Sequence, residues 1–116
     1  ARYMDSIERL WEVIGHLNVG LCLDTCHTWA GGIPTIDAVK GFKKLVKKID
    51  LIHFNDSKDG FESSRDRHEN LGKGKIPKEE LEYVIKNAKT DIIVETPNGP
   101  DAQKKDIAWI KRRLNK

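Results

Sequence analysis

The sequence contains 116 residues, with a formal net charge of +3 and a hydrophobic content of 38%. This length allows one domain or part of one, and no signal peptide or apolar run long enough to span a bilayer is present, which indicates a cytoplasmic protein without a membrane partner. The modest positive charge permits an anionic partner such as nucleic acid but does not require one, because a lysine-rich solvated surface has the same charge.

The chain alternates amphipathic helices with short apolar runs. Helices are predicted over residues 5–17, 35–49, 77–88 and 101–114, each with hydrophobic residues at helical spacing. Their predicted buried faces include Leu10 and Leu17, then Val39 and Phe42, then Leu81, Val84, Ile85 and Ala88, and last Ile107, Ile110 and Leu114. Short buried strands are predicted over residues 19–23, 51–54 and 92–94, and residues 29–34 are predicted to form a glycine-rich loop.

Two cysteines stand four residues apart, which is not the spacing of a redox or zinc-binding Cys-x-x-Cys pair. Cys22 lies in an apolar run and is predicted to pack in the core. Cys26 lies between two candidate ligands, so it is either a core residue or part of the lining of a site. Both thiols are expected to stay reduced in a cytosolic protein.

The order of elements predicts an α/β fold, because apolar strands that alternate with amphipathic helices form parallel sheets with helices outside. In such sheets, chemistry collects at the carboxyl ends of the strands. Here the three predicted strands end at Asp24, His53 and Glu95, so each presents a potential metal donor at the same edge.

Further donors follow these strand ends. His27 comes just after the first strand, and Asp66 and His68 lie in the loop after the second. Residues two apart in an extended segment point to the same side, so Asp66 and His68 can converge while Arg67 faces away. Six donors exceed the three or four that one zinc ion takes from protein, which predicts two or three metal ions.

Each candidate has a simpler interpretation. Asp24 could cap the following turn, His27 could be a surface loop residue, and His53 could be a hydrogen-bonded core histidine. The remaining candidates have simpler roles. His16, at a helix end and away from the other donors, is predicted to be structural or solvated, and the loop charges are predicted to be solvated, namely Asp56, Asp59, Glu62 and Glu69. Four basic residues flank the loop donors and either meet phosphate or solvate the loop: Arg65, Arg67, Lys73 and Lys75.

Four segments resemble the C-terminal signatures of the endonuclease IV family of apurinic/apyrimidinic (AP) endonucleases: LCLDTCHTWAGG, HFNDSK, SRDRHENLGKGKI and IVETP. They occur in the family's order and cover nearly the whole chain. The resemblance implies a TIM (β/α)₈ barrel with a trinuclear zinc site that cuts the DNA backbone 5′ of an abasic nucleotide. A typical barrel takes roughly 250 residues, so residues 1–116 would form its C-terminal portion, about three strands and four helices, without the N-terminal part.

The resemblance assigns roles to individual residues. Asp24, His53 and Glu95 would hold one zinc at the catalytic centre, and His27, Asp66 and His68 would hold another. This chain would then bind about one or two zinc ions, and DNA contacts would come from Arg67, Lys73 and Lys75. The partner would be double-stranded DNA with abasic sites, and the missing barrel half would come from another polypeptide or from self-association. Alone, the chain would cleave such DNA poorly or not at all.

Two other functions stay open from sequence. A metal-dependent sugar isomerase or epimerase of the same barrel superfamily also uses carboxylates and histidines at strand ends. The loop run Asp66-Arg67-His68 argues against it, because an isomerase needs one or two metals and a small pocket. A non-catalytic fragment that binds one zinc and no more is the other alternative.

Overall fold

The computed structural model describes residues 2–17, 20–46 and 49–114. Within these residues the helices are α1 (Arg2–Ile14), α2 (Thr25–Ala30), α3 (Thr35–Leu45), α4 (Lys78–Ala88) and α5 (Gly99–Leu114). The strands are β1 (Cys22–Asp24), β2 (Leu51–His53), β3 (Asp56–Ser57), β4 (His68–Glu69) and β5 (Asp91–Ile93). No helix in this part of the chain is long and apolar enough to cross a bilayer.

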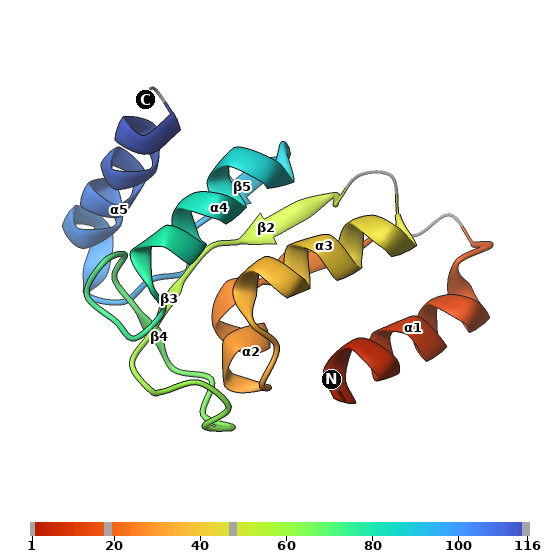
Figure 1. Cartoon of the computed structure of the whole chain (residues 1–116). Helices are drawn as coiled ribbons and strands as arrows, with labels where there is room; N and C mark the ends of the chain where they lie inside the picture. Colours follow the sequence, from red (N-terminus) through yellow and green to blue (C-terminus); the bar gives the residue numbers. More distant parts are fainter. Residues whose placement is uncertain (1, 18–19, 47–48, 115–116) are drawn as a thin grey trace.

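The sheet is parallel, as predicted, with strand order β1-β2-β5. The four longer helices lie side by side along it in the order α1, α3, α4, α5 (Figure 1). Strand residues alternate between the two faces of the sheet. Leu23 and Ile52 are paired in register and fully buried, so they belong to the face that the helices cover.

The core forms between this face and the helices. Val39 and Phe42 of α3 join Leu23 and Ile52 in one hydrophobic cluster. The stripe predicted for α4 is confirmed, because all four of its members are buried: Leu81, Val84, Ile85 and Ala88. Each fully buried aliphatic side chain contributes roughly 2 kcal/mol, which fixes the helices on this side of the sheet.

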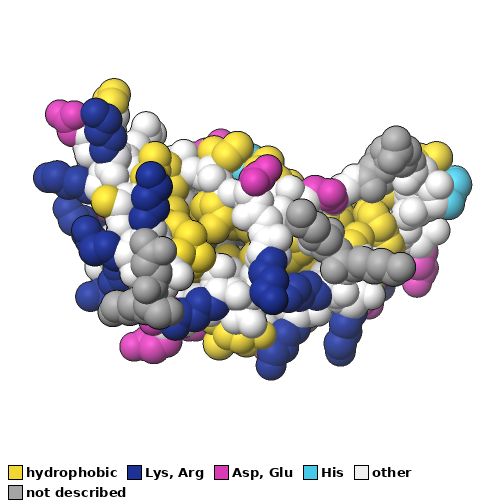
Figure 2. Space-filling view, turned by 90° about the horizontal axis from the view of Figure 1, so that it is seen from above, with side chains coloured by type: hydrophobic (Ala, Val, Ile, Leu, Met, Phe, Trp, Pro, Cys, Tyr) yellow, Lys and Arg dark blue, Asp and Glu magenta, His cyan; other side chains and the backbone are white. Residues whose placement is uncertain are grey.

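The opposite side of the sheet carries the residues in between. Cys22 is exposed there, so its predicted place in the core is wrong; strand alternation puts it on the same side as Asp24. Ile93 on β5 is also exposed. Figure 2 shows hydrophobic side chains gathered in a hollow of the surface, with lysine and arginine side chains beside it.

The end helices depart from their predicted faces. Leu10 is exposed, because α1 packs along α3 at the end of the helix row and is covered on one side, and Leu17 is exposed beyond the end of the helix at Ile14. The helix also begins at Arg2 rather than at Asp5. On α5, Ile107 and Leu114 are exposed, while Ile110 is buried as predicted. Trp109 beside it is also buried. It packs near Phe54 and beneath the Arg113 guanidinium.

Three short elements were not predicted, and the bounds of others differ. Helix α2 occupies part of the predicted loop, since Asp24 caps it by accepting the His27 N–H at 3.0 Å. The antiparallel pair β3 and β4 lies inside the loop predicted after the second strand. Strand β5 begins one residue early, α3 ends at Leu45, and α5 begins at Gly99. Val19, predicted to begin the first strand, lies outside the described residues.

Candidate metal centre

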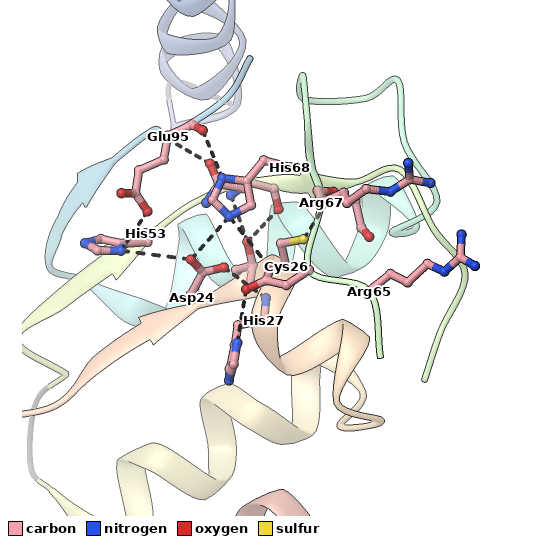
Figure 3. Close-up of polar contacts among 12 residues, drawn as sticks. Asp24, Cys26, His27, His53, Arg65, Arg67, His68 and Glu95 are labelled. Atoms are coloured by element: carbon pink, nitrogen blue, oxygen red, sulfur yellow. Dashed lines mark hydrogen bonds and ion pairs between the residues drawn. The ribbon is translucent and has the colours of Figure 1, made fainter. Parts of the chain in front are cut away.

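Three strand ends bring their polar side chains together (Figure 3). Asp24 and His53 are the last residues of β1 and β2 and are neighbours in register. Glu95 follows β5 by two residues and so continues the same side of the sheet. His53 Nδ1 lies 2.9 Å from Glu95 Oε1 and 3.9 Å from Asp24 Oδ2. The parallel arrangement thus places all three side chains at one edge of the sheet.

His68 joins this group from β4. Its Nε2 lies 3.7 Å from Asp24 Oδ2 and 3.7 Å from Asp66 Oδ1. Its Nδ1 lies 2.9 Å from the Glu95 carbonyl oxygen, which can only accept, so Nδ1 carries the proton. In the neutral ring, Nε2 then has its lone pair directed toward the two carboxylates. A backbone carbonyl that fixes the tautomer in this way is the usual support of a metal-binding histidine.

His27 and Asp66 complete the cluster. His27 Nδ1 lies 3.2 Å from Asp66 Oδ2, and both side chains are about half exposed. Partial burial acts to raise the pKa of Asp66, but hydrogen bonds with His27 and Cys26 outweigh it, so the net shift is downward. Asp66 is therefore held as a carboxylate, the form that accepts a cation.

The donor set fits zinc. Bonds of about 2.0–2.2 Å at tetrahedral angles place two zinc ligands about 3.3–3.6 Å apart, and the closest pairs here lie 2.9 to 3.9 Å apart. Donor atoms lie within 4.8 Å of one another in two groups, Asp24 with His68 and Glu95, and Cys26 with Asp66 and His68. The structure brings together all six residues singled out from sequence, and their role as ligands remains a prediction.

Cys26 lies beneath this cluster. It is fully buried, and its Sγ donates to the Arg67 carbonyl oxygen at 3.5 Å. Burial raises the pKa of this thiol to about 12, so in this structure it is neutral at pH 7. Its contact with the loop backbone fits the core interpretation, while its nearness to Asp66 and His68 also makes it part of the site lining.

Asn55 and Thr25 support the site and were not predicted to do so. The Thr25 hydroxyl donates to the Asn55 carbonyl oxygen at 2.6 Å and accepts the Asn55 N–H at 2.8 Å. The Asn55 side-chain oxygen accepts the Glu95 N–H at 2.8 Å. These bonds join the carboxyl ends of β1, β2 and β5. The sequence signal was a polar residue directly after the short apolar run that ends at Phe54.

The prediction that Asp56 is solvated is wrong. Asp56 is fully buried, and four backbone N–H groups donate to its carboxylate. Burial raises its pKa, and the four hydrogen bonds oppose that shift. The side chain faces inward because the polypeptide between β4 and α4 folds around it, a contact between segments that the local sequence does not reveal.

The other charged residues divide into two kinds. Arg67 donates from Nε and Nη2 to the two Asp59 oxygens at 2.8 and 2.7 Å, so Asp59 is paired rather than merely solvated. This pairing compensates the charge of the arginine predicted to meet DNA. Most of the others are exposed, as predicted for His16 and Glu62 and as phosphate contact requires of Arg65, Lys73 and Lys75. Glu69 is half-buried and accepts the Asn70 N–H.

Comparisons with known proteins bear on this geometry. A family model described as a xylose isomerase-like TIM barrel matches residues 1–113. The chain is 46% identical to the probable endonuclease 4 of Mycobacterium ulcerans over 99% of its own length and 45% of the relative's. It is 48% identical to the probable endonuclease 4 of Mycobacterium tuberculosis over 97% of its own length and 44% of the relative's. It thus spans less than half the length of these relatives.

A solved structure gives the same picture. The crystal structure of endonuclease IV from Thermus thermophilus superimposes with a TM-score of 0.76 and 28% identity. The match covers 93% of this chain and 43% of that one. The parallel strands and the helices outside them therefore follow the arrangement of part of a barrel.

Proposed function

Because this chain belongs to the xylose isomerase-like TIM barrel family and matches the C-terminal part of endonuclease IV, we propose that it carries half of a zinc-dependent AP endonuclease centre. The reaction is hydrolysis of the phosphodiester 5′ to an abasic site in double-stranded DNA. The observation that carries the proposal is the convergence of six donor side chains at the carboxyl ends of adjacent strands.

The ligand assignment is the one that the family resemblance implies, and pairwise contacts support it. Asp24, His53 and Glu95 would hold one zinc at the catalytic centre, since His53 lies between the two carboxylates. His27, Asp66 and His68 would hold another, with Asp66 between the two rings. Bound zinc would lower the pKa of a coordinated water and stabilise negative charge on the phosphoryl and leaving oxygens.

The protein residues have separate tasks in this proposal. His68 keeps its proton on Nδ1 against the Glu95 carbonyl, which leaves the Nε2 lone pair available to bind zinc. Lys73, Lys75 and Arg67 would contact the DNA backbone on either side of the lesion. An abasic nucleotide has no base to stack, so moving it out of the helix toward the metal centre costs little.

The rest of the barrel would come from polypeptide outside these 116 residues or from a second copy. The sheet is consistent with this, because Ile93 on the side away from the helices is exposed. The cytoplasm, where Cys22 and Cys26 stay free thiols, is the proposed location.

The test combines metal counting with a cleavage assay. Purified chain is loaded with zinc, counted by elemental mass spectrometry, and mixed with a duplex that carries one abasic nucleotide. We expect about one or two bound zinc ions, weak cleavage by the chain alone, and a 3′-hydroxyl end that a polymerase extends. Addition of the N-terminal part of a mycobacterial relative should increase cleavage.

Two results would contradict the proposal. If the wild type and an Asp24→Asn, His68→Ala double variant retain the same amount of zinc, these residues do not bind the metal. Full zinc-dependent cleavage by a monomer of this chain would contradict the proposal that another polypeptide or a second copy completes the barrel. An aldose–ketose isomerisation assay on the same preparation tests the isomerase alternative, and we expect no isomerase activity.

A further inference from the structure

The loop that links β4 to α4 is built around one carboxylate. Asp56 Oδ2 accepts the N–H groups of Gly72 and Gly74 at 3.0 and 3.1 Å. Its Oδ1 accepts the N–H groups of Ser57 and Ile76 at 2.8 and 3.1 Å. Both oxygens are thus fully used by backbone donors, and the charge is stabilised without any cationic side chain among these partners.

This arrangement determines where the two lysines lie. Residues 72, 74 and 76 turn their N–H groups toward Asp56, and Lys73 and Lys75 stand between them with exposed side chains. The Lys75 N–H also donates to the Ser57 carbonyl oxygen at 2.8 Å. Gly74 has no room for a side chain, since a Cβ there would collide with Ser57 O and the Asp56 carboxylate. The backbone that carries both lysines is therefore fixed.

The same carboxylate links the lysines to the metal centre. Asp56 lies on β3, where Ser57 is the register partner of His68 and Asp56 is the partner of Glu69. The strand pair sets the position of His68, and the hydrogen bonds of Asp56 set the position of the lysine backbone. One buried residue thus determines the spacing between a candidate zinc ligand and two exposed cations.

We propose that Asp56 is a positioning residue for DNA binding, which holds Lys73 and Lys75 at a fixed distance from His68 so that both contact backbone phosphates. This inference rests on the proposed function, because it takes DNA as the ligand of the lysines. Asp56 itself does not touch DNA, since its side chain is fully buried.

Asp56→Asn provides a sharp test. Whichever way the amide is oriented, its NH₂ group faces two backbone N–H donors, so two of the four hydrogen bonds that hold the loop are lost. Removal of a negative charge alone would strengthen binding to anionic DNA. A weaker complex would therefore indicate lost positioning rather than a change in charge.

The experiment is a double-mutant cycle on the 116-residue chain. Affinity for a duplex with one tetrahydrofuran abasic analogue is measured by fluorescence anisotropy across a series of KCl concentrations. Four proteins are compared: wild type, Asp56→Asn, Lys73→Ala with Lys75→Ala, and the triple variant. Lys104→Ala with Lys105→Ala on α5 removes the same charge from exposed positions elsewhere and serves as the matched control.

We expect the lysine pair to reduce the slope of log affinity against log salt by up to about 2, since each phosphate contact contributes about 0.9. Asp56→Asn should weaken binding about tenfold at low salt and flatten the slope in the same direction. In the lysine-free background it should change affinity less than about twofold, because its effect acts through the lysines. The α5 control should keep most of the wild-type slope.

The outcomes are separable. Additive effects of Asp56→Asn and the lysine pair, or unchanged binding by Asp56→Asn, would overturn the inference and leave the proposed function intact. Absence of salt-dependent DNA binding by wild type would overturn both. If Asp56→Asn does not fold, as judged by circular dichroism, Gly74→Ala takes its place in the same cycle and faces the same criteria.

Discussion

Two sets of carboxylates in this protein have opposite surroundings. Asp24, Asp66 and Glu95 are partly exposed and lie beside imidazole nitrogens at the strand ends. Asp56 and Asp106 are buried and accept hydrogen bonds from neutral groups. The donors to Asp56 are backbone N–H groups, and the donors to Asp106 are the Asn70 side-chain amide and the Leu71 backbone N–H. The first set lies beside imidazole nitrogens that could bind a metal ion together with the carboxylates, while the second set is enclosed by hydrogen-bond donors.

This difference separates binding capacity from structural support. A carboxylate such as Asp56, in which each oxygen already accepts two buried backbone N–H groups, has little acceptor capacity left for a cation. A partly exposed carboxylate with an imidazole nitrogen about 3 to 4 Å away can share a cation with that nitrogen. The kind of partner, more than the residue type, therefore distinguishes the candidate metal centre from the framework that holds it.

The largest expected effect on stability separates Asp56 from Asp24. Asp56→Asn should lower the free energy of unfolding by about 3 kcal/mol, since it opposes buried N–H donors with an NH₂ group. Asp24→Asn should change it by less than about 1 kcal/mol, because asparagine also caps a helix such as α2. Urea unfolding with a metal chelator present measures both. Equal losses would erase the distinction.

Metal affinity should show the reverse order. His68→Ala should weaken zinc binding by at least about 100-fold, since loss of a ligand should cost as much as loss of a supporting contact or more. Asp106→Asn, a change in the buried set, should leave zinc affinity within about threefold. Competition titration with a chromogenic chelator gives both values. A larger loss from Asp106→Asn than from His68→Ala would place the metal elsewhere.

A pair of glycines tests the framework without a charge change. Gly74→Ala should destabilise the chain by about 2 kcal/mol, because its methyl group meets the Asp56 carboxylate and a backbone oxygen. Gly60→Ala should lie within about 0.5 kcal/mol of wild type, since the added Cβ has nothing within 4 Å. Thermal melts of the two variants measure the contrast, and a neutral Gly74→Ala would mean that the loop moves freely.

The smallest expected effect is a pH dependence of opposite sign at two aspartates. Burial raises the pKa of Asp56 above 3.8, so the part of the stability that comes from this shift is present below pH 3.8 and is lost as pH rises through the folded-state pKa, while the four accepted N–H groups limit the loss. Arg67 lowers the pKa of Asp59, so that contribution is present above pH 3.8 and is lost as pH falls through the lowered value. Urea midpoints of Arg67→Ala and wild type should differ at about pH 6 and converge at low pH. A gap that widens toward low pH would contradict the assignment.

Much of the candidate site was predictable because strand ends are a local signal. An apolar run that stops at Asp24 or His53 fixes which edge of a parallel sheet receives the side chain, whatever the helices do. The α4 stripe was predictable for the same reason, since its period is confined to one helix. Membership of the barrel family, first suggested by resemblance, is confirmed by the family match.

The remainder depends on contacts between distant segments. Asp56 and Asp59 lie in the same polar run, yet only Asp56 is enclosed, because residues 72–76 fold over it. Cys22 lies in an apolar run, but the side of the sheet that it occupies depends on strand pairing, and that side is exposed. Helix α2 is six residues long, and its start depends on a single aspartate cap rather than on hydrophobic periodicity.

The Asn55 bridge has a thermodynamic consequence. One amide side chain and one hydroxyl fasten three strand tips together, so the space between them has its dimensions before any ion arrives. Ion capture then requires little ordering of the polypeptide, and calorimetry should find a small entropic penalty for it. Asn55→Ala would remove the hydrogen bond to the Glu95 N–H, so the strand ends would have to be ordered each time an ion binds.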